Sequence, residues 1–125
     1  MSNAGLFFEE FKTALLTSVN TSMPCEVLAY NESTRTAKIQ PLFKVKDKGY
    51  DPISLPPIES VPVLKQKYKV NGGPVQEYVP VLDRGDTVLV VFCQRAIDDA
   101  QNGQNVFPGI SRMFSIQDAV IVGVF

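Results

Sequence analysis

The sequence predicts a mainly β protein, a small OB-type antiparallel barrel of five to six strands preceded by one N-terminal amphipathic α-helix. Three observations support this fold class. Apolar residues near the N-terminus recur at helical spacing, the later segments alternate apolar and polar residues, and those segments are short and separated by turn residues. A β-sandwich is the alternative, although it would need more strands at even spacing.

The 125 residues have the length of one domain, and we expect residues 1–22 to form a helix and leader and residues 23–125 the barrel. A hydrophobic content of 45% with 20% charged residues is ordinary for a globular protein. The formal net charge is only −1, so no extended basic surface for nucleic-acid phosphates is expected.

An amphipathic helix is predicted over residues 5–19, where apolar residues recur at spacings of three and four. Glu9 and Glu10 fall in its first turns, where the helix dipole favours negative charge. The helix is expected to end before Pro24. Its apolar positions are Phe7, Phe8, Phe11, Leu15 and Val19.

The first hairpin is predicted from period-two alternation in residues 25–31 and 36–46, joined by a turn. Pro41 cannot donate a ladder hydrogen bond, so the second strand is expected to be bulged there or to lie at an edge. Residues 48–63 contain four prolines and are predicted to form a long surface excursion without continuous secondary structure.

Further strands are expected in the second half of the chain. A third strand should begin at Val61, a turn lies at residues 71–74, and residues 76–82 return as a short strand. Residues 84–86 form a tight turn before the central strand. That strand is predicted at Thr87–Gln94, an exposed loop at Ile97–Gly109, and the last strand at Ala119–Phe125.

No residue pattern indicates catalysis, a cofactor or a metal site. Histidine is absent, which removes the commonest general base and the commonest zinc ligand. Cys25 and Cys93 lie far apart, and a disulfide between them is allowed but not required. The carboxylate pairs Glu9-Glu10 and Asp98-Asp99 are explained as solvated acids. We therefore expect a protein that is not an enzyme and has no catalytic, cofactor-binding or metal-binding residues.

The last strand predicts an interaction surface, because it is apolar on both faces. One face can line the barrel, while the other presents Val120, Val122 and Val124. Either sister copies of the chain cover this second face, or the chain covers it within its own fold. The candidate subunit-interface residues are Phe7, Phe8, Phe11, Val120, Val122, Val124 and Phe125.

Two structural ion pairs are also predicted near the end of the barrel. Arg112 and Asp118 flank the turn before the last strand, and Arg95 and Asp98 follow the central strand. We expect these pairs to stabilise the fold and not to act in catalysis.

Several segments, taken in order, resemble the N-terminal OB-fold domain of central-spike proteins from contractile-tailed bacteriophages, which are membrane-piercing baseplate spikes. The resemblance covers roughly residues 20–125. The segments are Met23-Pro24-Cys25-Glu26-Val27, Tyr30–Leu42, Ser60-Val61-Pro62-Val63, Arg84–Phe92, Arg95-Ala96-Ile97-Asp98 and Arg112–Val120.

This resemblance implies a structural protein of a phage or prophage-derived contractile tail, a baseplate central spike or hub adaptor at the tail-tube tip. It implies a homotrimer that contacts baseplate hub and tail-tube proteins, made in the bacterial cytoplasm and assembled into a phage or phage-like particle. The chain stops where a β-helical shaft should begin, so membrane contact is expected only indirectly, through a shaft absent from this chain. No nucleic-acid partner is expected under this hypothesis. The alternative is an OB-fold binding module for single-stranded nucleic acid or carbohydrate.

Overall fold

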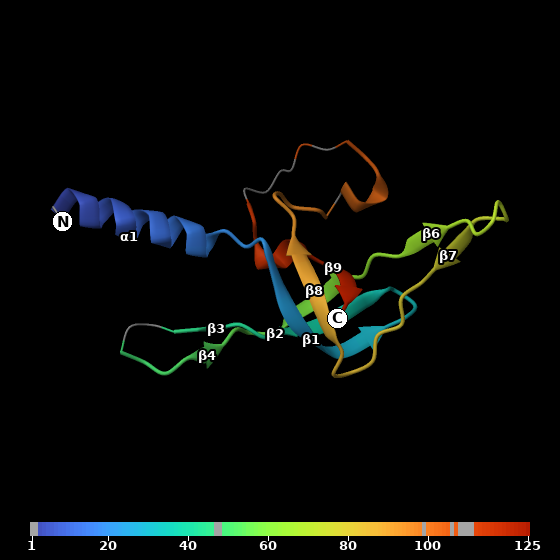
Figure 1. Cartoon of the computed structure of the whole chain (residues 1–125), viewed down its shortest axis with the longest axis horizontal. Helices are drawn as coiled ribbons and strands as arrows, with labels where there is room; N and C mark the ends of the chain where they lie inside the picture. Colours follow the sequence, from blue (N-terminus) through green and yellow to red (C-terminus); the bar gives the residue numbers. More distant parts are fainter. Residues whose placement is uncertain (1–2, 47–48, 99, 106, 108–111) are drawn as a thin grey trace. The chain divides into compact units, whose positions relative to one another are not determined.

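The computed structural model describes residues 3–46, 49–98, 100–105, 107 and 112–125 (Figure 1). These residues fall into two compact units. The first, here called the helix-loop unit, comprises residues up to 21 together with residues 92–118. The second, the barrel unit, comprises residues 22–91 and 119–125. Each unit is described by itself below.

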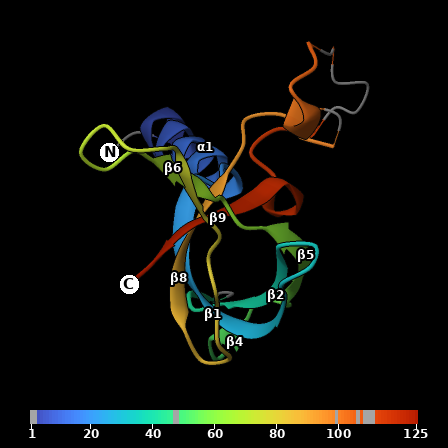
Figure 2. The same ribbon diagram turned by 90° about the vertical axis from the view of Figure 1, so that its right-hand side faces the viewer.

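A curled five-stranded sheet forms the barrel unit, with the strand order β5-β2-β1-β8-β9. β1 pairs antiparallel with both β2 and β8, and β2 pairs antiparallel with β5. The sheet curls until its two ends meet, as the end-on view in Figure 2 shows. The strands are β1 (Ser22–Asn31), β2 (Thr36–Pro41), β5 (Ile58–Pro62), β8 (Thr87–Phe92) and β9 (Ala119–Val124).

Closure of the barrel occurs between the residue after β5 and the middle of β9. Val63 and Ile121 form a parallel bridge, and the Leu64 N–H donates to the Ile121 carbonyl over 3.1 Å. Five short strands curled in this way, preceded by a helix, confirm the predicted mainly β fold of the OB type.

The barrel interior is filled from alternate positions of the strands. β2 and β8 both alternate buried with half-buried residues along their whole length, as a strand with one inward face must. The side chains of Val27, Ile39, Val88, Val90 and Ile121 are completely buried. Period-two alternation in the sequence therefore identifies the core correctly.

Two short hairpins lie outside the barrel sheet, where the sequence predicted other arrangements. The β3–β4 arm pairs β3 (Lys44–Val45) with β4 (Ile53–Ser54), inside the segments expected as one long strand and an excursion. The β6–β7 arm pairs β6 (Gln66–Tyr68) with β7 (Gln76–Tyr78), so the predicted returning strand forms but ends at Tyr78 and not at residue 82.

Proline explains both differences from the expected strands. The barrel strand β2 ends at Pro41, and β5 begins directly after Pro57, three residues earlier than the predicted start of the third strand. Pro80 follows β7 closely, and its carbonyl accepts a 2.7 Å hydrogen bond from the Tyr30 hydroxyl of β1. Because proline lacks the N–H that a ladder needs, each of these positions favours a break in a strand.

The turn before β8 is specified by its glycine and its flanking acid. Gly85 has a φ of 95°, a conformation that residues with a Cβ adopt rarely. Its N–H donates to the Val27 carbonyl, and the Asp86 carboxylate accepts from the Asp83 N–H over 2.8 Å. The predicted tight turn is thus held by one hydrogen bond to β1 and by one hydrogen bond within the turn itself.

The helix-loop unit contains α1 (Asn3–Ser18), which confirms the predicted N-terminal helix and extends it by two residues at its start. No residue described in this helix is buried. Two short 3₁₀ turns, η1 (Ala100–Asn102) and η2 (Ile116–Asp118), lie in the second part of the unit. Part of the predicted exposed loop, at residues 99, 106 and 108–109, lies outside the described residues.

Truncation of a core residue should unfold the barrel much more readily than truncation of an arm residue. We expect Ile39→Ala to lower the free energy of unfolding by about 2–5 kcal/mol, because Ile39 is fully buried and its removal leaves a cavity. Ile53→Ala is the matched control, because Ile53 is 59% exposed. Its effect should stay within about 0.5 kcal/mol in urea denaturation. Equal costs for the two variants would contradict the placement of the core.

Candidate functional site

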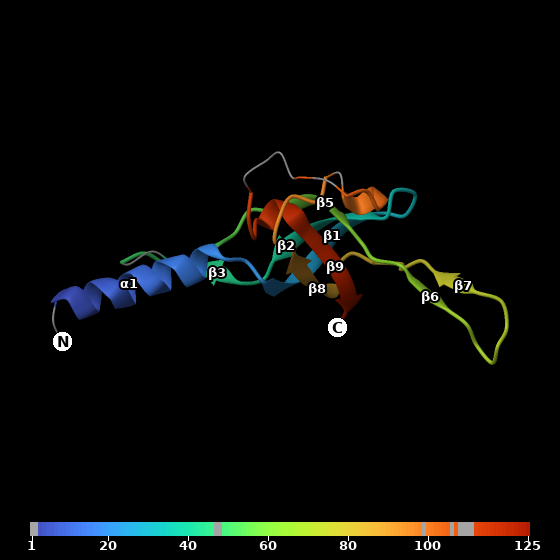
Figure 3. The same ribbon diagram turned by 90° about the horizontal axis from the view of Figure 1, so that it is seen from above.

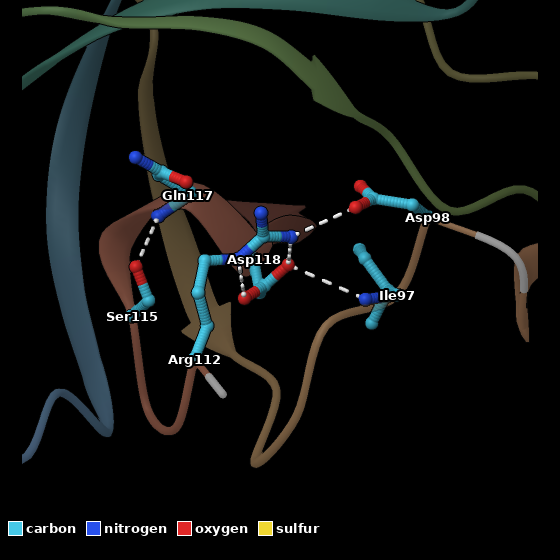
Figure 4. A network of polar contacts seen from close by, with 6 residues as sticks. All are labelled: Ile97, Asp98, Arg112, Ser115, Gln117 and Asp118. Carbon is cyan, nitrogen blue, oxygen red and sulfur yellow. Dashed lines mark hydrogen bonds and ion pairs between the residues drawn. The ribbon is translucent and has the colours of Figure 1, made fainter. Parts of the chain in front are cut away.

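A buried carboxylate organises the end of the helix-loop unit. Asp118, the last residue of η2, is completely buried, and the guanidinium of Arg112 binds it through two hydrogen bonds. Arg112 Nη2 lies 2.8 Å from Asp118 Oδ1, and Arg112 Nε lies 3.0 Å from Asp118 Oδ2 (Figure 4). Such a bidentate arrangement fixes both the distance and the orientation of the two groups.

The same guanidinium holds a second, exposed acid. Arg112 Nη2 also lies 3.0 Å from Asp98 Oδ2, and the Ile97 N–H donates to Asp118 Oδ1 over 3.3 Å (Figure 4). Hydrogen bonds to Asp118 and Asp98 raise the pKa of Arg112 above its ordinary value, so the cation persists at every pH at which proteins fold. This network ties the loop around Ile97 to η2, which ends at Asp118.

The sequence predicted Arg112, Asp118, Arg95 and Asp98 as members of two separate pairs. The structure brings Arg112, Asp98 and Asp118 together in one network. Arg95 takes part in an antiparallel backbone bridge with Met113, also within the helix-loop unit. The shared guanidinium was not foreseen, because Asp98 and Arg112 are separated by a loop whose length gives no indication of where it returns.

Within the described residues, no group of three or more cysteine, aspartate or glutamate side chains could hold a metal ion. The two cysteines are free thiols, and burial raises the pKa of both. A thiol with a raised pKa is protonated at neutral pH and is a weak nucleophile. Asp98, from one of the two carboxylate pairs considered in the sequence, is engaged by Arg112. The described side chains therefore present no recognisable catalytic arrangement.

Exposed apolar surface is the most prominent feature of the barrel unit. Among its described residues, more large apolar side chains are exposed than are buried. Exposed apolar side chains that gather in a patch are a common feature of interaction sites. The exposed side chains on and beside the two arms are Leu42, Phe43, Val45, Tyr50, Ile53, Leu64, Tyr68, Val70, Val75, Tyr78, Val79 and Val81.

The predicted interface residues of β9 differ in how far they are covered. Val120 and Val122 are half-buried, whereas Val124 and Phe125 are 53% and 77% exposed. Gly123, expected to share the inward face with Ala119 and Ile121, is exposed. The first half of β9 thus completes the barrel, and its last residues extend beyond the core.

The predicted interface residues of α1 are all exposed. Phe7, Phe8 and Phe11 are each more than half exposed, and they contact one another. The rings of Phe7 and Phe11 stack with centroids 6.2 Å apart, and Phe7 meets Phe8 edge-on at 5.7 Å. No helix among the described residues has the length and apolar character needed to cross a membrane.

Comparison with known protein families gives a match over residues 23–123, to the family described as the phage protein Gp138 N-terminal domain. The chain belongs to this family. The match begins in β1 and ends in β9, so it covers the five strands of the barrel sheet and leaves out α1. It confirms the sequence resemblance to the N-terminal domain of a phage protein. A comparison with curated proteins finds no match.

Loss of the buried carboxylate should be much more costly than loss of the exposed one. We expect Asp118→Ala to lower the free energy of unfolding by about 3–5 kcal/mol, because it removes the buried acceptor of the Ile97 N–H and leaves Arg112 with only the exposed Asp98. Asp98→Ala is the matched control, since the Asp98 side chain is 60% exposed and contacts the same guanidinium. Its cost should stay below about 1 kcal/mol. Chemical denaturation of both variants checks this prediction, and equal costs would argue against the network.

Alkaline pH should weaken the barrel through Cys25. Burial raises the pKa of this thiol from 9.0 to about 11, so the unfolded chain loses the proton first. The stability contributed by the neutral thiol is present below pH 9 and is lost as pH rises towards 11. We expect the stability of wild type relative to Cys25→Ala to fall by about 2–3 kcal/mol over this window. A difference that stays constant in denaturation curves from pH 8 to pH 12 would contradict the burial of this thiol.

Proposed function

We propose that this domain is a structural component of a phage or prophage-derived contractile tail, at the baseplate central spike or as a hub adaptor at the tail-tube tip. In this proposal three copies associate around a common axis and contact baseplate hub and tail-tube proteins. Membership of a phage protein family supports the proposal that the domain belongs to a phage particle. The sequence resemblance to spike domains supports the proposed position at the central spike or hub.

The observation that carries this proposal is the exposed apolar surface of the barrel unit, which exceeds its buried counterpart in large side chains. Two-stranded hairpins are marginally stable in water, so the β3–β4 and β6–β7 arms require covering surface from elsewhere. Association with other chains supplies that surface. A net charge of −1 leaves little repulsion between identical copies.

The proposed role is not enzymatic. The described thiols are protonated at neutral pH, the buried carboxylate is neutralised by Arg112, and the pair Arg112–Asp118 has a sufficient structural explanation. A building block needs surface complementarity instead of a reactive group, and apolar surface is what the described residues offer.

A second candidate function is the binding of single-stranded nucleic acid, favoured by one observation on the β6–β7 arm. The rings of Tyr68 and Tyr78 lie edge-to-face with centroids 5.6 Å apart, and Lys67 and Lys69 flank Tyr68 in sequence. Exposed aromatic rings beside cations are the usual platform for unpaired bases. The ion pair between Lys65 and Glu77 reduces the positive charge of this platform.

The oligomeric state tests the proposal directly. We expect sedimentation equilibrium of the whole chain to give three times the mass of one chain at micromolar concentration, since the apolar surface is covered only in the assembly. A strictly monomeric chain up to millimolar concentration would contradict the proposal.

Fluorescence anisotropy with labelled oligothymidine distinguishes the second candidate. Under the structural proposal we expect no saturable binding at physiological salt. Binding that weakens steeply with salt and is lost in Tyr68→Ala would instead support the nucleic-acid function.

A further inference from the structure

A groove opens in the barrel unit beside the C-terminal half of β9. Barrel closure ends with the hydrogen bond from Leu64 to Ile121, after which the chain turns away into the β6–β7 arm (Figure 3). A groove of about 220 Å³ lies between the two diverging stretches. Its lining residues come from the base of the arm and from Ile121–Val124.

The size and chemistry of the groove limit what can occupy it. Small-molecule sites usually have volumes of about 300–1,000 Å³, so this groove is too small for a typical ligand and suits one or two side chains. None of its lining residues carries a charge. Leu64, Tyr78, Val79 and Val124 each remain about half exposed around it. An uncharged, apolar segment of polypeptide is therefore the matching occupant.

Gly123 provides a second, independent observation at the same place. It lies inside β9, where a glycine weakens a strand. Gly123 is not among the glycines with positive φ, and a Cβ added to it would meet no atom within 4 Å. Nothing in the described fold of one chain therefore requires a glycine at this position. Glycine in a strand is explained when another backbone approaches closely.

We infer that the groove and the exposed face of β9 at Gly123 form the docking surface for an extended apolar segment of a second copy of this chain. This inference rests on the proposed homotrimer and specifies where its subunits meet. It adds the face of β9 at Gly123 to the outward-facing valines that the sequence indicated. The backbone of the second copy lies close to Gly123, and one or two of its side chains enter the groove.

A second copy fits this surface better than another occupant for two reasons. The same chain carries exposed apolar strand residues on both of its arms, which is the chemistry that the groove accepts. In a ring of three, each copy also offers one groove and inserts one segment, so no groove stays open. The exposed parts of Leu64, Tyr78, Val79, Val124 and Phe125, with a comparable set on the partner, would bury on the order of 1,000 Å² in total, the lower limit of a specific interface.

The test compares three variants of the whole chain by sedimentation equilibrium. We expect Gly123→Val to weaken self-association at least ~10-fold, because its side chain fills space that the neighbouring backbone needs. Gly123→Ala should weaken association by a smaller factor. Ser22→Val is the matched control, since it adds a β-branched side chain at an exposed strand position outside the groove and outside both arms. It should associate like wild type.

A folding readout separates loss of docking from loss of structure. Because a Cβ at position 123 meets no atom in one chain, the dissociated Gly123→Val protein should keep the far-ultraviolet circular dichroism of wild type. Wild-type association in Gly123→Val would overturn the inference while leaving the homotrimer intact, and the groove would then belong to another partner. A wild-type chain that is monomeric throughout would overturn both the inference and the proposed function.

Discussion

A barrel of five short strands can bury a side chain only at every second position of each strand. This limits how many apolar side chains the interior can hold. The interior is filled by medium-sized residues such as Val27, Ile39 and Val90, each completely buried. Large apolar side chains remain exposed on the arms and at the end of β9. In the proposed assembly, other copies of the chain cover them.

Within the helix-loop unit, the Arg112–Asp118 network holds Asp118, the residue directly before β9 in the sequence. The chain leaves the sheet after β8 and comes back only at Ala119. A buried carboxylate directly before that residue is tolerated because a bidentate guanidinium and a backbone N–H satisfy it. The hydrogen bonds of Asp118 thus account for its burial within the helix-loop unit.

The sequence predicted the barrel well because alternation reports which face of a strand is inward. It was less successful between residues 42 and 82, where the chain forms two arms instead of further barrel strands. Exposed residues in an arm do not alternate between an inward and an outward face, so alternation does not identify arm strands.

The polar network around Asp118 could be predicted only in part. Arg112 and Asp118 lie six residues apart and could be paired from the sequence, whereas the inclusion of Asp98 depends on a distant loop.

Family membership and physical reasoning lead to the same kind of protein by different routes. The family match identifies a domain of a phage protein. The exposed apolar side chains are the basis of our proposal that the chain associates with other copies, and Gly123 is the basis for where we propose that they meet. These two routes are independent, because the surface follows from the coordinates of one chain.

Hydrogen exchange at increasing protein concentration tests the central claim most directly, since it reports which backbone groups become covered by other chains. The account predicts that amides of β6, β7 and residues 122–125 exchange more slowly as concentration rises, while those of Val88–Val90 are protected throughout. Identical exchange of the arms and of the end of β9 at all concentrations would contradict it.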